Sequence, residues 1–89
     1  MKEKPISISI FGLGYVGTVT AACLAKNGHH IIGVDKDLNK VTAIGNGDSP
    51  IVEPKISDLL ISSVENKTLS STRDATKAIN DSEVSIVAV

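Results

Sequence analysis

The run from Ile6 to Gly17, I-S-I-S-I-F-G-L-G-Y-V-G, constrains the fold more than any other part of the sequence. Its first half alternates isoleucine with serine and closes on Phe11, a pattern typical of a β-strand. Its second half is G-x-G-x-x-G, with glycines at Gly12, Gly14 and Gly17. Glycines at this spacing let a chain turn sharply out of a strand and into a closely packed helix. The run therefore predicts a strand, a tight turn and a helix N-terminus in succession.

The rest of the sequence predicts further helices and strands in alternation. The expected strands are residues 6–11, 31–34, 68–71 and 84–89. Four helices are expected. The first covers residues 15–27 and is ended by Gly28, and the second is capped by Asp37 and ended by Gly45-Asn46-Gly47. The third has Pro54 in its first turn, and the fourth covers residues 74–79 and is capped by Ser71 or Thr72. Residues 48–54 are expected to be a connection between two helices.

Apolar residues at helical spacing predict which side of each helix faces the core. The expected inward residues of the three longer helices are Val16, Val19, Ala22 and Cys23; Leu38, Val41 and Ile44; and Ile56, Leu59, Leu60 and Val64.

Strands that alternate with helices are typical of a parallel sheet. We therefore predict the α/β class, as a Rossmann-type doubly wound parallel sheet that is incomplete, with about four strands and intervening helices. The β-branched run Val84–Val89 is expected to be a strand buried on both faces. Loops that contact ligands follow such strands in doubly wound folds. Residues 1–89 are thus interpreted as the N-terminal part of a nucleotide-binding domain in a longer protein.

Composition excludes several classes of function. The chain has 89 residues, 42% hydrophobic and 21% charged, with a net charge of -1. Nucleic acids and anionic membranes favour strongly basic surfaces, so neither is an expected partner. No apolar run approaches the ~18 residues that cross a bilayer. A single cysteine, Cys23, excludes an internal disulfide and fits a cytoplasmic protein.

The glycine turn in this context predicts a site for a dinucleotide. Gly12 allows the tight turn, Gly14 allows backbone to approach a pyrophosphate, and Gly17 allows the helix to pack on the strand. The backbone N–H groups of Tyr15 and Val16 are expected to face the phosphates at the positive end of the helix. The alternatives are a glycine-rich turn that serves packing alone, and a Tyr15 side chain that covers the sheet edge.

Asp35 follows the second expected strand, 18 residues after Gly17. A carboxylate there accepts hydrogen bonds from the ribose hydroxyls and repels a 2′-phosphate, which favours NAD over NADP. Lys36 and Lys40 weaken this preference, because nearby cations attract a phosphate. Lys40 is either a contact to the adenosine end of the cofactor or a solvated surface lysine, and Asp35 has the alternative of a simple turn carboxylate.

Other reactive residue types are assigned structural roles. No His or Lys is placed to activate Cys23, so it is expected to be a small buried residue and not a nucleophile. His29 and His30 follow the first helix, where positively charged side chains interact favourably with the helix dipole. Two adjacent histidines without further ligands do not predict a metal site. Glu53 is expected to cap a helix, with a functional carboxylate as the alternative.

With these motifs in place, the chain resembles the nucleotide-sugar 6-dehydrogenases, the UDP-glucose and GDP-mannose dehydrogenase family. Three stretches carry the resemblance: F-G-L-G-Y-V-G-T-V-T-A-A-C-L-A-K-N-G-H-H-I-I-G-V-D, G-D-S-P-I-V-E-P, and residues 68–89. The resemblance covers nearly the whole chain and leans slightly toward the GDP-mannose member, as in alginate producers. One departure is Lys55, which stands where the family usually has glycine.

The resemblance implies a four-electron oxidation of a sugar C6 alcohol to a carboxylate, with two NAD and a cysteine nucleophile, in polysaccharide biosynthesis. It implies that Gly12, Gly14, Tyr15, Val16 and Gly17 hold the pyrophosphate, that Asp35 binds the ribose, and that Lys40 contacts the cofactor. The catalytic cysteine and its assisting residues are expected downstream, so no catalytic residue is assigned here.

By the same resemblance, downstream domains would bind the nucleotide sugar and the parent would be a homo-oligomer. Two other hypotheses stay open. One is an NAD(H)-binding module without catalysis. The other is another NAD-dependent dehydrogenase, of the hydroxyacyl or phosphogluconate type.

Overall fold

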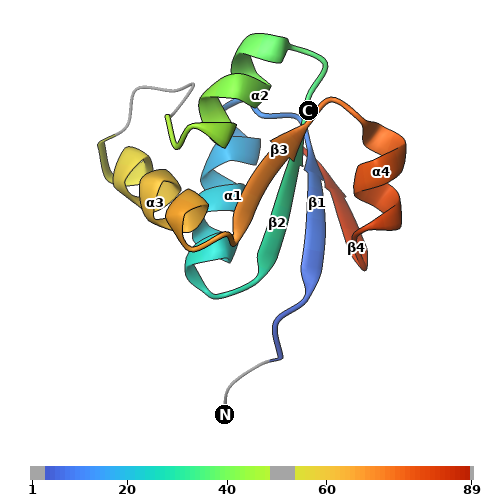
Figure 1. The fold of residues 1–89 in the computed structure, drawn as a ribbon, viewed down its shortest axis with the longest axis horizontal. Helices are drawn as coiled ribbons and strands as arrows, with labels where there is room; N and C mark the ends of the chain where they lie inside the picture. Colours follow the sequence, from blue (N-terminus) through green and yellow to red (C-terminus); the bar gives the residue numbers. More distant parts are fainter. Residues whose placement is uncertain (1–3, 49–53, 89) are drawn as a thin grey trace.

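The computed structural model describes residues 4–48 and 54–88, which form a parallel β-sheet covered by helices (Figure 1). Along the chain the elements are β1 (Ser7–Phe11), α1 (Tyr15–Lys26), β2 (His30–Val34), α2 (Leu38–Gly45), α3 (Pro54–Glu65), β3 (Leu69–Thr72), α4 (Ala75–Asn80) and β4 (Val84–Val87). The predicted α/β class and the alternation of strands and helices are confirmed. The strand boundaries differ from the prediction by one or two residues within the described range.

The sheet order is β3-β2-β1-β4, and all three strand pairs are parallel. Successive strands step outward from β1 to β3, and β4 then returns to the other side of β1. Helices α1, α2 and α3 lie on one face of the sheet and α4 lies on the other (Figure 1). The direction of winding therefore reverses between β1 and β4, and ligands bind beyond the carboxyl ends of strands at such a switch point.

The hydrophobic core lies between the sheet and the α1–α3 layer. Ile10, Leu13 and Leu60 have no exposed surface, and Ile31 has 1%. Ile8, Ile31 and Leu69 are in register across three strands, so they form one apolar row on that face. The other face of β1 is polar: the buried Ser9 hydroxyl lies 2.7 Å from that of Ser85 and accepts from Ser82 at 2.9 Å.

Helix α1 packs on the sheet through small residues, and this corrects part of the prediction. Its buried residues are Gly17, Thr18, Ala21, Ala22 and Ala25. Val19 is half-buried against the core as expected, but Val16 is 63% exposed and Cys23 is also exposed. At Gly17 the helix lies so close to the end of β1 that an added Cβ would overlap the Gly12 carbonyl oxygen. The larger Val16 and Cys23 are therefore turned away from the sheet, and the expected burial of Cys23 is wrong.

Helices α2 and α3 agree more closely with the prediction. The Asp37 side chain caps α2 by accepting from the Asn39 N–H at 2.9 Å, and Gly47 adopts a φ of 77° after the helix. Ile44 is buried, but Leu38 is 57% exposed because it directly follows the cap and precedes the packed turns. The expected inward residues of α3 do contact the core: Ile56, Leu59, Leu60 and Val64.

Two expectations near the end of the described chain are wrong. The cap of α4 is Asp74, whose carboxylate accepts from the Lys77 N–H at 3.0 Å, and neither Ser71 nor Thr72. Ser71 instead donates to the Val41 carbonyl at 2.6 Å. Strand β4 is not buried on both faces: Val87 is 70% exposed. It pairs with β1 alone among the described residues, and so forms an edge of the sheet.

Several sequence features fall outside the described residues. These are Glu53, most of the S-P-I-V-E-P stretch, and Val89. The cap proposed for Glu53 is therefore untested, whereas α3 does begin at Pro54, as predicted.

Candidate dinucleotide-binding site

A pocket of about 530 Å³ lies at the switch point, at the carboxyl ends of β1 and β4. It brings together six of the seven residues predicted from the sequence; the seventh, Gly17, is buried against Gly12. The end of β4 completes the wall of this pocket. The lining residues are Gly12, Gly14, Tyr15, Val16, Asp35, Lys40, Val87 and Ala88.

Gly12 and Gly17 make the turn that shapes the pocket. Gly12 has a φ of 104°, a conformation that residues with a side chain rarely adopt. Its N–H donates to the Val34 carbonyl at 2.8 Å, which ties the turn to β2. A Cβ on Gly17 would lie 1.7 Å from the Gly12 carbonyl oxygen. The conformation of the loop therefore favours glycine at both positions, whether or not a ligand binds.

Gly14 differs from the other two glycines, because its role depends on a ligand. A Cβ at this position would meet no protein atom within 4 Å, and its φ of −80° is open to any residue. Gly14 is the N-cap of α1, and the first turn carries no acidic side chain. Free backbone N–H groups at a helix N-terminus attract anions. The open space beside Gly14 fits the close approach of a phosphate group to those N–H groups.

Asp35 is fixed beside the turn by two backbone hydrogen bonds. Its carboxylate oxygens accept from the Asp37 N–H at 2.9 Å and from the Leu13 N–H at 2.8 Å. These bonds, together with the charge of Lys40, hold the pKa of Asp35 below its ordinary value, although partial burial opposes them. Two carboxylate oxygens offer about four acceptor positions. Asp35 therefore still has free acceptor positions for ribose hydroxyls when both backbone hydrogen bonds are formed.

Leu13 and Gly33 support this arrangement and were not singled out from the sequence. Leu13 occupies a variable position of the glycine motif, yet it has no exposed surface. It packs over Gly33 of β2, where an added Cβ would lie 2.9 Å from its side chain. A glycine inside a strand is the signal that could have indicated this contact, because it marks a close approach.

A second pocket of about 360 Å³ adjoins the first and shares Gly12 and Asp35 with it. Neither Arg73 nor the apolar walls were predicted as site residues. Arg73 follows β3, so its place after a strand could have suggested it. The lining residues are Phe11, Gly12, Val34, Asp35, Lys36, Arg73 and Ala75.

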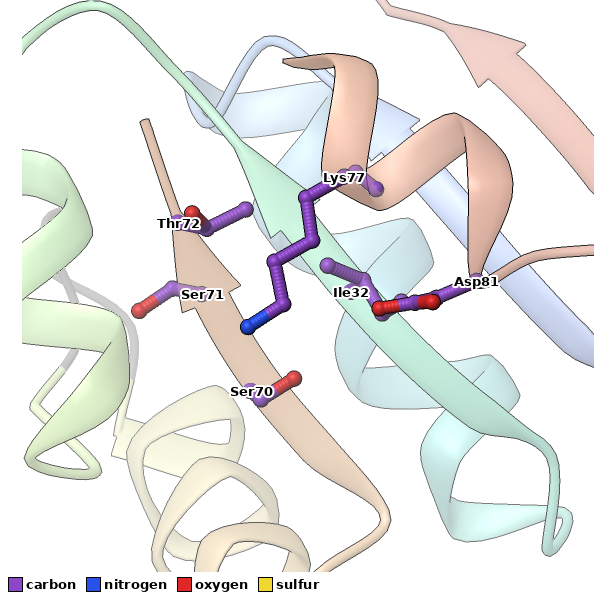
Figure 2. Close-up of a pocket in the computed structure, with 7 residues that line it drawn as sticks. Ile32, Ser70, Ser71, Thr72, Lys77 and Asp81 are labelled. Atoms are coloured by element: carbon purple, nitrogen blue, oxygen red, sulfur yellow. The ribbon is translucent and has the colours of Figure 1, made fainter. Parts of the chain in front are cut away.

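A third hollow of about 310 Å³ lies away from the glycine turn, between β2, β3 and α4. Lys77 extends from α4 across Ile32 toward Ser70 and Ser71, and Asp81 lies at the other end of the hollow (Figure 2). It contains none of the residues of the glycine turn.

The remaining candidate residues have simpler surroundings. His29 accepts a hydrogen bond from the Ile6 N–H through Nδ1 at 3.2 Å. This bond links the start of β1 to the start of β2. Across residues 4–48 and 54–88, no group of three or more metal-ligating side chains is found. In the same ranges, no helix has the length and apolar character needed to cross a membrane.

The sheet order, the glycine turn and the carboxylate after β2 define a dinucleotide-binding domain of the Rossmann type. Residues 6–89 match the sequence profile of the UDP-glucose/GDP-mannose dehydrogenase family, NAD binding domain. The chain belongs to this family, and the match is to the family's NAD-binding domain.

Individual relatives agree with this assignment. The chain is 51% identical over 82 residues to GDP-mannose 6-dehydrogenase of Pseudomonas aeruginosa, covering 92% of this chain and 19% of the relative. It is 39% identical over 84 residues to UDP-glucose 6-dehydrogenase of Rhizobium meliloti, covering 94% and 19%. A crystal structure of a ternary complex of the Pseudomonas aeruginosa GDP-mannose dehydrogenase superposes with a TM-score of 0.91, over 92% of this chain and 19% of that one. The chain thus spans about a fifth of the length of these relatives.

Proposed function

We propose that this chain is the cofactor-binding part of an enzyme that oxidises the C6 alcohol of a nucleotide sugar to a carboxylate with two NAD. Residues 1–89 would then be the N-terminal part of a larger Rossmann domain, followed by the segments that bind the sugar and carry the nucleophile. The single observation that carries the proposal is the pocket at the switch point. In it the N-terminus of α1 and the Asp35 carboxylate lie on the same opening.

Each site residue has a distinct part in this proposal. The N–H groups of Tyr15 and Val16 bind the pyrophosphate, and Gly14 leaves room for it. Asp35 accepts from the ribose hydroxyls and repels a 2′-phosphate, while Lys40, which lines the same pocket, contacts the adenosine end of the cofactor. When bound, NAD supplies the hydride acceptor. The residues of this chain hold it in place and fix the preference for NAD over NADP.

The preferred sugar nucleotide is proposed to be GDP-mannose. The support is the higher identity to the GDP-mannose enzyme, 51% against 39% for the UDP-glucose enzyme. We further propose a role in polysaccharide biosynthesis, a cytoplasmic location and a homo-oligomeric parent.

The test uses the polypeptide encoded by the whole reading frame. Calorimetry should detect saturable NAD binding, and NADH formation should be faster with GDP-mannose than with UDP-glucose. Absence of NAD binding would refute the proposal, as would NAD binding with no turnover of either nucleotide sugar. Faster turnover of UDP-glucose would refute the sugar assignment alone.

A further inference from the structure

The pocket beside Asp35 has walls of a different kind from the glycine-turn pocket. Phe11 of β1 and Val34 of β2 are in register on the face of the sheet that carries α4. Ala75, the first residue of α4, lines the same pocket. The pocket therefore has an apolar floor made by Phe11 and Val34, and three charged residues complete its lining: Asp35, Lys36 and Arg73.

Stereochemistry connects this pocket to the dinucleotide. In the proposed function Asp35 binds the adenosine ribose, and the adenine base is joined to that ribose by one glycosidic bond. The base must therefore lie beside Asp35, on the side away from the pyrophosphate. The apolar pocket shares Gly12 and Asp35 with the pyrophosphate pocket, so it has the position and the chemistry for a flat, weakly polar ring.

Arg73 is placed to cover such a ring. It lies in the connection between β3 and α4, and it is exposed. Within residues 4–48 and 54–88, no hydrogen bond or ion pair holds its guanidinium group. A guanidinium group is planar, weakly hydrated and stacks on aromatic faces. A ring bound on the Phe11–Val34 floor would offer its open face to this side chain.

We propose that Arg73 is a cofactor-binding residue that stacks on the adenine ring, a role that rests on the proposed function. The competing role is a charge contact to the 2′-phosphate of NADP. Asp35 lines the same pocket and its carboxylate is held in the charged form, so a phosphate there would be repelled. Base stacking is the role compatible with both residues.

The experiment compares Arg73→Ala with Lys77→Ala in the polypeptide encoded by the whole reading frame. Both changes remove one exposed positive charge close to or within α4, but Lys77 lines the separate hollow of Figure 2. NAD and NADP are titrated by calorimetry against each variant. Arg73→Ala should weaken both cofactors by the same factor, about two- to fivefold. Lys77→Ala should change neither, and the melting temperatures of both variants should equal that of the wild type.

Two results would overturn the inference. One is equal NAD affinity for Arg73→Ala and Lys77→Ala. The other is a loss confined to NADP, which would make Arg73 a phosphate ligand. Both leave the proposed function standing, because the wild type still binds NAD. If the wild type fails to bind NAD, the proposed function itself is refuted, and the inference that rests on it fails with it.

Discussion

Replacing Gly14 or Gly17 by alanine separates the two roles of the glycine turn, which are ligand binding at Gly14 and close packing of α1 at Gly17. The two changes are chemically identical and lie three residues apart, at the N-cap and in the first turn of α1. Their surroundings differ: a Cβ on Gly17 lies 1.7 Å from the Gly12 carbonyl oxygen and 2.9 Å from its carbonyl carbon, whereas a Cβ on Gly14 meets nothing within 4 Å.

The distances give the size of the effect at Gly17. Ordinary contacts of a Cβ begin at 3.4 Å, so helix and turn must move apart by a further 1.7 Å. Both contacting atoms belong to the backbone and no side chain can rotate away. Over-packing of a core costs about 1–3 kcal/mol and occasionally more, and we place Gly17→Ala at about 3 kcal/mol or above. For Gly14→Ala the strain is absent, so stability should change by less than about 1 kcal/mol.

The assay is urea unfolding followed by circular dichroism, paired with NAD titration by calorimetry. Gly17→Ala should shift the unfolding midpoint strongly, and Gly14→Ala should leave it nearly in place while greatly weakening NAD binding. A Gly14→Ala variant with wild-type NAD affinity would refute the placement of the pyrophosphate. A Gly17→Ala variant of wild-type stability would refute the close contact between Gly17 and the Gly12 carbonyl group.

Three further predictions concern single carboxylates. Asp35→Ala should weaken NAD by about 1–3 kcal/mol in calorimetry and narrow the preference for NAD over NADP; an unchanged ratio of the two affinities would contradict the ribose role. Because the pKa of Asp35 is lowered in the folded chain, its stabilisation is present above the ordinary Asp value of 3.8 and is lost as pH falls through the folded pKa. As the pH is lowered from above 3.8, the free energy of unfolding should therefore fall more steeply for the wild type than for Asp35→Asn. Equal slopes for the two proteins would contradict a stabilising role for the Asp35 carboxylate. Asp74→Ala removes the cap of α4 and should cost about 1 kcal/mol in urea unfolding, whereas no change would show that the capping bond is unimportant in solution.

The parts of the fold that depend on local chemistry could be predicted from the sequence. The turn at Gly12 requires a positive φ, and the cap at Asp37 requires a short acceptor side chain; both signals lie in the residues themselves. The position of Asp35 followed from its place after an apolar strand. Parallel pairing then gathered six of the seven predicted residues at one opening.

The parts that depend on distant neighbours could not be predicted in this way. Helix α1 faces the sheet with Gly17, Ala21 and Ala25, and hydrophobic periodicity gives such small residues little weight. The exposure of Val87 depends on which strands flank β4, and nothing within that strand specifies them. Arg73 reaches the pocket because β3 pairs with β2, a contact between residues far apart in the sequence.

The most direct measurement is a crystal structure of the whole polypeptide soaked with NAD. The pyrophosphate should lie within hydrogen-bond distance of the Tyr15 and Val16 N–H groups, with a ribose hydroxyl on the Asp35 carboxylate. Electron density for NAD at any other place on this domain would contradict the account.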